Sequence, residues 1–342
     1  MNQTILESKD CNSTPAQASA DSCTRTDEPS SSARVAIVIP CYNEELTIGK
    51  VVRDFRAELP NAQIYVFDNN SEDRTVEVAR TAGARIAFER RQGKGYVVQG
   101  MFRDVESDVY VMVDGDGTYP AAKVHELIAP VLNGEADMVV GSRLMERSQS
   151  QFKALNQIGN QFFLAVINMI FGLRLSDILS GYRAFNREFV KNIPLRTGGF
   201  ETETELTIKA LARGYRIVEI SADLTARPEG SHSKIRILHD GRLILTTILA
   251  LFRDYKPLTF FGAVGLFCIG LGLIPGTIVV IEFIKTGLVP RLPSAVLAVG
   301  LVLSGFLSIT AGLVIHTIAR RFQDLEHQLQ VLARETPPRK GS

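Results

Sequence analysis

Two carboxylates one residue apart, Asp114 and Asp116, directly follow the apolar run 109–113. A strand that ends at this point brings both side chains to the same edge of its sheet. Carboxylate oxygens are hard ligands, and one or two of them hold Mg²⁺ or Mn²⁺ together with the phosphates of a substrate. An acidic turn has the same composition, because Asp and Gly are favoured where a chain reverses. The pair alone does not decide between these two interpretations.

Three other apolar runs end in polar clusters of the same kind: residues 35–39 precede Pro40, Tyr42 and Glu44, residues 64–67 precede Asp68, and residues 138–140 precede Arg143. Continuous apolar runs are typical of strands that are buried on both faces of a parallel sheet. In such sheets, ligands bind outside the carboxyl ends of the strands. The four clusters therefore favour a ligand site over an isolated acidic turn.

Helical spacing of apolar residues separates these runs, in segments 48–59, 97–105 and 124–131. Pro120 suits the first turn of the last segment, and Gly134 suits its end. The alternation of strands and helices predicts an α/β fold with a doubly wound, mostly parallel sheet.

Several chemistries lack their usual motifs. No Gly-x-Gly-x-x-Gly follows the first run, and the Gly-Lys pairs at Gly49 and Gly93 lack the upstream glycine of a P-loop. The five histidines lie outside the clusters, and a net charge of +1 gives no reason to expect nucleic acid. The four cysteines are scattered, which favours a reducing compartment over disulfides or zinc. What remains is chemistry in which a metal and cations stabilise a departing nucleoside diphosphate.

The two ends of the chain differ in character. Residues 1–33 are polar and lack an apolar stretch, so we expect a disordered leader. No Asp, Glu, Lys or Arg occurs in 257–281 or in 292–319, and each stretch exceeds the roughly 20 residues that cross a bilayer. We expect two transmembrane helices, at 257–284 and 292–319. The alternative is a pair of buried core helices.

Basic residues flank these segments: Arg242, Arg253 and Lys256 come before the first, and Arg320 and Arg321 follow the second. The positive-inside rule then places the large domain and the tail 320–342 in the cytoplasm of an integral membrane protein. Residues 235–256 mix basic and apolar residues at near-helical spacing. This segment either lies in the headgroup plane or is an ordinary packing helix.

Six motifs in this order resemble glycosyltransferase family 2, and within it the membrane-anchored polyprenyl- or dolichyl-phosphate sugar transferases: 40–45, 68–75, 114–116, 141–143, 180–183 and 230–234. The resemblance implies a GT-A (Rossmann-like) domain over 34–234. It implies inverting, Mg²⁺- or Mn²⁺-dependent transfer of a hexose from a nucleotide-diphosphate sugar to undecaprenyl or dolichyl phosphate. The acceptor lipid explains why a soluble-looking domain carries membrane segments.

The resemblance also implies roles for single residues. Pro40, Tyr42 and Glu44 would frame the nucleotide, Asp68 would bind its base, Asp114 and Asp116 the metal, Arg143 the acceptor phosphate, and Arg227 and Lys234 the donor phosphates. Asp177 matches an aspartate near the acceptor. Because an acceptor phosphate is already ionised, positioning is the expected task of that residue.

The roles of Lys94 and of an acidic group at 201–205 are less clearly indicated by the sequence. Lys94 either reaches donor phosphates or only opens a helix. Glu201, Glu203 and Glu205 are expected at the start of a helix from the helix dipole alone. Relatives often have Gln at the position of Thr118, and segment 227–234 is one residue longer than the common pattern.

Three other functions compete with the leading one. A processive polysaccharide synthase of the same broad family would carry a Gln-x-x-Arg-Trp motif, but this chain has no Trp. A membrane-tethered nucleotide-sugar-binding protein without catalysis would not need both Asp114 and Asp116. A transporter would need more polar groups in the spans than His316, Ser and Thr. Small residues such as Gly262, Gly265 and Gly270 would permit a homo-oligomer.

Overall fold

The structure is a computed structural model that describes residues 33–142, 164–165, 167–168, 176–199, 201–222 and 237–335. Arg143, Arg227, His232 and Lys234 lie outside these residues, as do residues 1–32 of the predicted leader.

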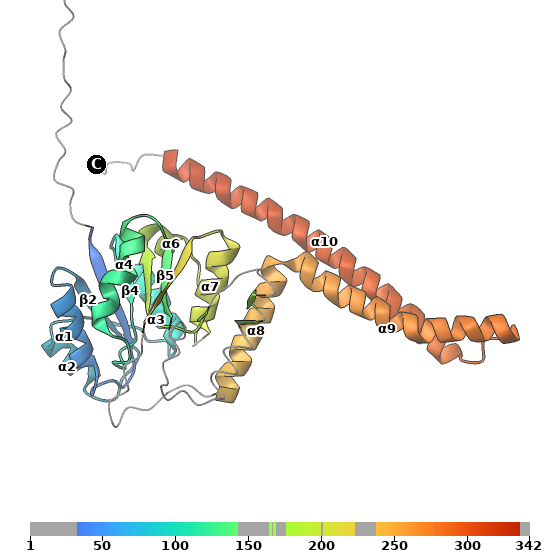
Figure 1. The fold of residues 1–342 in the computed structure, drawn as a ribbon, viewed down its shortest axis with the longest axis horizontal. Coiled ribbons are helices and arrows are strands. Elements are labelled where there is room, and N and C mark those ends of the chain that lie inside the picture. The colour runs from blue at the N-terminus through green and yellow to red at the C-terminus, as the bar shows by residue number, and fades with distance from the viewer. Residues whose placement is uncertain are drawn as a thin grey trace, which may run out of the picture. The chain divides into compact units, whose positions relative to one another are not determined.

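The elements follow one another in the order β1 (Val35–Cys41), α1 (Ile48–Glu58), β2 (Gln63–Asp68), α2 (Thr75–Thr81), β3 (Arg85–Phe88), α3 (Lys94–Asp104), β4 (Val109–Met112), the 3-10 turn η1 (Ala121–Lys123), α4 (Val124–Leu132), β5 (Met138–Ser142), β6 (Arg183–Asn186), α6 (Arg187–Asn192), α7 (Thr202–Ala212), β7 (Ile217–Ser221), α8 (Ile237–Tyr255), α9 (Pro257–Thr286) and α10 (Leu292–Glu335) (Figure 1).

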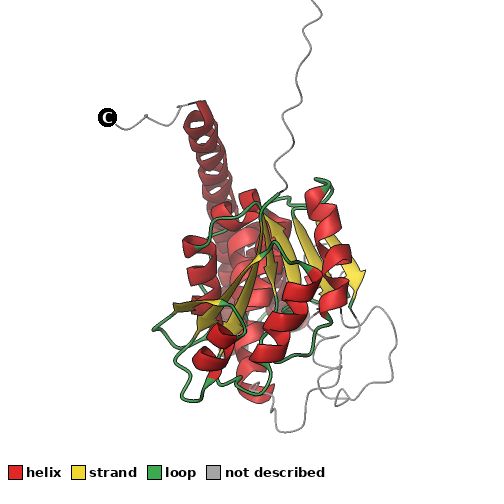
Figure 2. Cartoon of the chain, turned by 90° about the vertical axis from the view of Figure 1, so that its left-hand side faces the viewer, coloured by secondary structure: helices red, strands yellow, loops and turns green. Residues whose placement is uncertain are grey.

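The strands form one seven-stranded sheet in the order β3-β2-β1-β4-β6-β5-β7, with helices on both of its faces (Figure 2). Among the strands that the structure describes, only β6 is antiparallel to its neighbours, β4 and β5, and the other four strand pairs are parallel. Strands β4 and β5 therefore run in the same direction. The carboxyl ends of β1, β2, β4 and β5 consequently share one edge, which confirms the predicted doubly wound, mostly parallel sheet.

The core has two apolar layers, one on each face of the sheet. Val109 and Val111 of β4 pack with α1 and α4 on one face. Tyr110 and Met112, the alternate residues of the same strand, pack with α3, α6 and α7 on the other. Both faces of the strand are buried, and this is why its sequence is continuously apolar instead of alternating.

Among the described residues, one face of helix α8 packs against the α/β domain. Ile244, Ile248 and Leu251 are buried beside Ile178 and Ile208, in a third apolar cluster. Leu249, on another face of the helix, is 44% exposed. The packing interpretation of 235–256 therefore holds for one side of α8, and the headgroup interpretation stays a prediction for the other.

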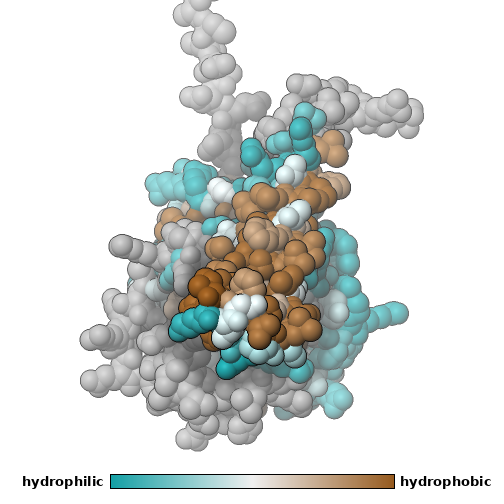
Figure 3. All heavy atoms as spheres, turned by 90° about the vertical axis from the view of Figure 1, so that its right-hand side faces the viewer, coloured by the Kyte–Doolittle hydropathy of each residue, from teal (hydrophilic) through white to brown (hydrophobic). Residues whose placement is uncertain are grey.

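Helices α9 and α10 are long and apolar. Pro257–Thr286 and Leu292–Phe322 are 30 and 31 residues long, with mean hydropathies of 2.4 and 2.2 in their most apolar windows. These lengths and compositions suffice to cross a membrane. Only 17% of each window is buried, whereas a core helix would be mostly buried. Figure 3 shows the apolar side chains gathered on the surface of these helices.

Glycines let α9 and α10 approach each other closely. A Cβ on Gly265 would lie 2.6 Å from the carbonyl oxygen of Gly305, and one on Gly272 would lie 2.9 Å from the Cβ of Leu301. Gly265 thus serves packing within the chain. Gly262 and Gly270 face open space, so self-association through these two glycines stays a prediction.

Replacing Gly305 by valine tests this packing. The new Cβ would lie 2.6 Å from the carbonyl oxygen of Gly265, so we expect Gly305→Val to cost about 1–3 kcal/mol through overpacking. Gly300→Val, in the same helix, is the control, because nothing lies within 4 Å of its Cβ position. Thermal unfolding in detergent should show a lower melting temperature for Gly305→Val alone. Equal melting temperatures would contradict the packing described.

Candidate active site

The loops that follow β1 and β2 are bound to each other by hydrogen bonds. The backbone N–H of Asn43 donates to Ser71 Oγ at 2.9 Å, and that of Glu44 donates to Thr75 Oγ1 at 2.7 Å. The Asn43 side chain accepts from Glu72 N at 2.8 Å. Asn43 has a φ of +51°, a left-handed conformation that asparagine tolerates better than most residues. The loop carrying Tyr42 and Glu44 is therefore fixed by the loop after Asp68.

Asp68 ends β2 directly opposite Cys41 of β1. The Asp68 side chain is buried, and its Oδ2 accepts a hydrogen bond from Ser71 N at 3.1 Å. Its other oxygen, Oδ1, is buried and has no hydrogen-bond partner among the described residues. A carboxylate oxygen in this state is costly unless a donor reaches it. Tyr42, which follows β1 on the same edge, is 37% exposed.

The loop after β4 carries Asp114 and Asp116 and lies against the start of α1. Thr47 Oγ1 donates to the carbonyl oxygen of Gly115 at 2.7 Å. A Cβ on Gly115 would lie 2.7 Å from Cys41 Sγ, so the loop can approach β1 only because this residue is glycine. Asp116 is nearly buried, and its Oδ1 accepts from Thr118 N at 3.1 Å and from Thr118 Oγ1 at 2.7 Å.

Lys94 is the first residue of α3 and bridges two carboxylates. Its Nζ lies 2.5 Å from Asp114 Oδ1 and 2.5 Å from Glu203 Oε1. Burial by itself would lower the pKa of Lys94, but the charges of Asp114 and Glu203 outweigh it and raise that pKa far above its ordinary value. Lys94 is therefore a permanent cation beside the predicted metal ligands.

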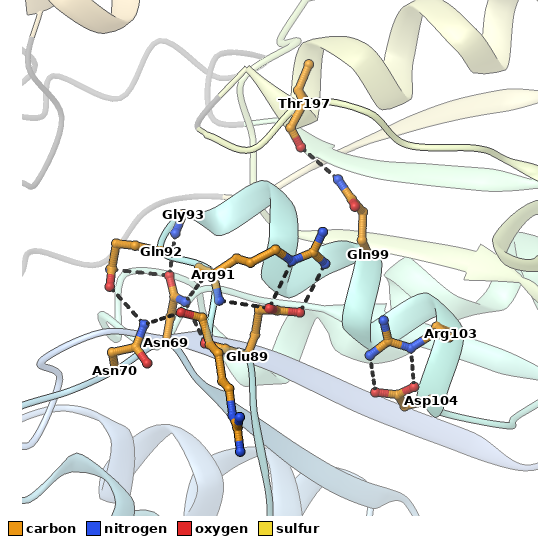
Figure 4. A network of polar contacts seen from close by, with 11 residues as sticks. Asn69, Asn70, Glu89, Arg91, Gln92, Gly93, Gln99, Arg103, Asp104 and Thr197 are labelled. Carbon is orange, nitrogen blue, oxygen red and sulfur yellow. Dashed lines mark hydrogen bonds and ion pairs between the residues drawn. The ribbon is translucent and has the colours of Figure 1, made fainter.

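The backbone around Lys94 is held by close contacts between main chains. Gly95 N donates to the carbonyl oxygen of Gly198 at 3.0 Å, and a Cβ on Gly95 would collide with the carbonyl oxygen of Thr197. Gly93 has a φ of +136°, which only glycine adopts readily. Asn69 Oδ1 also accepts from Gly93 N at 2.7 Å (Figure 4). The end of β2 thereby positions the start of α3.

The network in Figure 4 continues along the loop that leads from β3 to α3. Asn69 Nδ2 donates to the carbonyl oxygens of Glu89 and Arg91 at 3.0 and 2.8 Å. Farther along α3, Gln99 Nε2 donates to the carbonyl oxygen of Thr197 at 2.9 Å. The hydrogen bonds of Asn69 fix the loop that precedes Lys94, and the hydrogen bond of Gln99 connects α3 to the segment around Thr197.

The carboxylate of Glu205 fixes the backbone of the segment 196–197. It accepts from Arg196 N and Thr197 N at 3.0–3.1 Å and pairs with Lys209 at 2.6 Å. Burial would raise the pKa of Glu205, but the hydrogen bonds from Lys209 and Thr197 outweigh it and lower that pKa. The helix dipole alone predicted acids at the start of α7. The structure shows that Glu203 and Glu205 are buried in specific ion pairs, which the spacing of the acids did not reveal.

Asp177 lies in the loop before β6, and its neighbours fix the conformation of that loop. Asp177 N donates to Glu219 Oε1 of β7 at 3.2 Å, and Asp177 Oδ1 accepts from Leu179 N at 3.0 Å. The fully buried Arg183 donates to the carbonyl oxygens of Ile178 and Ser180 at 2.9 and 2.8 Å. A Cβ on Gly181 would collide with the Asp114 carboxylate. This loop therefore abuts one of the two carboxylates that follow β4.

The structure thus gathers most of the residues predicted for the site along one edge of the sheet. Pro40, Tyr42, Glu44 and Asp68 come from the β1 and β2 ends, and Lys94, Asp114, Asp116 and Asp177 come from α3, the β4 end and the loop before β6. Arg143, Arg227 and Lys234 lie outside the described residues. The roles given to these three stay predictions.

The acidic residues of this edge fit a metal that arrives with a ligand. Among the described residues, no group of three or more His, Cys, Asp and Glu side chains is arranged to hold a metal ion. Mg²⁺ and similar ions are commonly bound through one or two carboxylates together with substrate phosphates. Asp114 and Asp116 supply that number of carboxylates, so this set suits a metal shared with a diphosphate.

Comparison with known sequences identifies relatives. Residues 36–193 match the model of "Glycosyl transferase family 2". Glycosyltransferase AglJ of Haloferax volcanii is 34% identical over 240 residues, which cover 70% of this chain and 78% of that protein. The Dolichyl-phosphate hexose transferase of the same organism is 32% identical over 54% of this chain and 80% of its own length. The Dolichol-phosphate mannosyltransferase of Pyrococcus furiosus is 26% identical over 65% of this chain and 64% of its own length.

Solved structures show the same fold. The glucosyl-3-phosphoglycerate synthase of Mycobacterium tuberculosis, in complex with Mn²⁺ and uridine-diphosphate-glucose, has a TM-score of 0.55 to this chain. The alignment covers 64% of this chain and 79% of that one, at 23% sequence identity. The likeness confirms the GT-A-like architecture of the sheet.

Replacing Gly95 by alanine tests the close contact that positions Lys94. Its Cβ would collide with the Thr197 carbonyl oxygen, so we expect Gly95→Ala to destabilise the protein by about 1–3 kcal/mol. Gly100→Ala is the control in the same helix, because its Cβ would meet only ordinary contacts at 3.6 Å and beyond. Alanine should stabilise a helix interior by up to about 1 kcal/mol there. Similar melting temperatures for the two variants would refute the contact.

Proposed function

The chain belongs to glycosyltransferase family 2, and we propose that it transfers a hexose from a nucleotide-diphosphate sugar to a polyprenyl phosphate at a membrane surface. The observation that carries this proposal is the meeting of three features at one edge of the sheet. These are the open acceptor oxygen of Asp68, the carboxylates of Asp114 and Asp116, and the cation Lys94. They suit the base, the metal and the diphosphate of one ligand.

The β1 and β2 ends would bind the nucleoside of the donor. Asp68 Oδ1 lacks a hydrogen-bond partner in the part of the chain that the structure describes, and an N–H of a nucleobase would supply one. Pro40 lies near the end of β1, and Tyr42 and Glu44 lie on the loop that follows, which is hydrogen-bonded to the loop after Asp68. The mycobacterial structure with bound uridine-diphosphate-glucose supports a donor of this class.

Asp114, Asp116 and Lys94 would act on the diphosphate. When bound, Mg²⁺ or Mn²⁺ neutralises the negative charge that develops as a diphosphate departs. Asp116 is oriented for this purpose by two hydrogen bonds from Thr118. Lys94, fixed by two glycines and Asn69, adds a preorganised positive charge. Binding and charge stabilisation need no covalent intermediate, which agrees with inversion at the sugar carbon.

The names of two relatives and the C-terminal helices support a lipid phosphate as the acceptor. Two of the relatives are named as dolichyl- or dolichol-phosphate sugar transferases. Helices α9 and α10 would anchor the domain beside the lipid phosphate, which raises the effective concentration of the acceptor at the active site. A lipid phosphate is ionised near neutral pH and attacks without a general base. Asp177, buried beside Arg183, would then position the acceptor loop, and Arg143 would meet the acceptor phosphate.

The basic residues that flank the two spans support a position of the domain on the cytoplasmic side of this membrane. The face of α8 that carries the exposed Leu249 would lie on the same membrane surface. Arg242 and Arg253 are exposed on α8, as is Leu249. Apolar side chains flanked by basic ones are typical of helices in the headgroup region.

A sugar-transfer assay tests the proposed function. Membranes containing the protein are incubated with a panel of radiolabelled nucleotide sugars and polyprenyl phosphate, with and without Mg²⁺ or Mn²⁺. We expect metal-dependent label in the lipid fraction for one of the sugars, with a single sugar added per lipid. Long polymers would indicate a processive synthase instead, and binding without transfer would indicate a protein that has lost catalysis.

Asp116→Asn should reduce lipid-linked label on the order of 100-fold or more, because the metal loses a carboxylate ligand and with it several kcal/mol of charge stabilisation. Asp104→Asn is the control, since Asp104 pairs with its neighbour Arg103 at the exposed end of α3. Both variants should insert into membranes normally. Full transfer activity of Asp116→Asn would exclude the proposed metal role.

A further inference from the structure

We infer that Lys94 is a built-in cation that competes with the divalent metal for Asp114, and that Glu203 is the positioning residue that sets the strength of this competition. The inference rests on the proposed function and deepens it. It concerns what the two side chains do before and during binding of the donor.

The two carboxylates that Lys94 bridges differ in their exposure to solvent. The Glu203 side chain is 4% exposed, whereas that of Asp114 is 26% exposed. Glu203 lies in the buried stretch 202–210 of α7, and water or a ligand has little access to it. Asp114 faces the edge where the donor would bind. Glu203 is therefore the permanent partner of Lys94, and Asp114 is the partner that can be exchanged.

This arrangement lets Asp114 change partners without leaving a buried charge unpaired. If a metal binds the Asp114 carboxylate, the Lys94 ammonium keeps its contact with Glu203. Without Glu203, the same event would leave a nearly buried ammonium with no counter-ion, which is strongly unfavourable. An ammonium group has three N–H donors, so the donor released from Asp114 becomes free for a diphosphate oxygen. Glu203 thus makes it easier for metal and donor to displace Lys94 from Asp114.

Glu203 also affects a second buried cation. Burial lowers the pKa of Arg183, and the charges of Glu203 and Asp177 oppose that shift. Arg183 fixes the loop that contains Asp177 and abuts Asp114. The charge of Glu203 therefore favours two buried cations, Lys94 and Arg183.

The test is a double-mutant cycle on Mn²⁺ affinity, with no donor present. Free Mn²⁺ is measured by electron paramagnetic resonance during titration of the full-length protein in detergent, so the readout does not depend on catalysis. We expect Lys94→Met to bind Mn²⁺ about fivefold more tightly than the wild type, because Asp114 loses its competing cation. We expect Glu203→Gln to bind it about fivefold more weakly, because Asp114 is then the one ion-pair partner that Lys94 retains among the described residues.

The double variant decides whether Glu203 acts through Lys94. If it does, Lys94→Met/Glu203→Gln should bind Mn²⁺ like Lys94→Met alone. Glu203→Asp should restore affinity toward the wild type, and thermal unfolding identifies any variant that fails to fold. Glu126→Gln, which removes an exposed carboxylate paired with Lys123, is the control and should leave affinity unchanged.

The inference is overturned if Glu203→Gln weakens Mn²⁺ binding equally in the Lys94→Met background, since Glu203 would then act on the metal directly. It is also overturned if the single variants bind like the wild type. Sugar transfer by the wild type, assayed in parallel, separates this failure from that of the proposed function. Metal-dependent transfer together with unchanged Mn²⁺ affinities would refute the role of Glu203 alone.

Discussion

A lysine ammonium held between Asp114 and Glu203 requires support from several elements, because a nearly buried cation is stable only when its partners stay in place. The contacts at 2.5 Å to both carboxylates join α3, the β4 end and α7. Asn69 fixes the backbone just before Lys94, and the segment 197–198 fixes it just after. Much of the edge where four strands end is therefore organised around one ion-pair bridge.

This bridge explains features that otherwise look unrelated. Glycines at 93 and 95 permit main-chain contacts that no side chain would allow. Glu205, two residues after Glu203, is buried because it anchors the segment that contacts those glycines. At the same edge, Asp68 Oδ1 has no hydrogen-bond partner among the described residues, and Thr118 orients the carboxylate of Asp116. A donor that combines a base, a diphosphate and a metal would meet each of these groups.

The sequence predicted the sheet well where burial on both faces made the strands continuously apolar, as at 35–39 and 109–113. It did not reveal β6, because that strand begins with the fully buried Arg183, whose burial depends on hydrogen bonds to the carbonyl oxygens of Ile178 and Ser180 that form only when the loop before the strand is folded. The partnership of Lys94 with Glu203 was hidden for a similar reason. An acid at a helix start is expected from the dipole, and only the fold brings residues 94 and 203 together. Arg143 lies outside the described residues, so its role depends on the family resemblance.

A structure of the protein with Mn²⁺ and a nucleoside diphosphate, located by anomalous scattering of the metal, would test the central claim most directly. The account predicts Mn²⁺ bound by the carboxylates of Asp114 and Asp116 and by diphosphate oxygens, with Lys94 still paired to Glu203 but separated from Asp114. Mn²⁺ bound away from the two aspartates, or bound there with the Lys94–Asp114 pair unchanged, would contradict it.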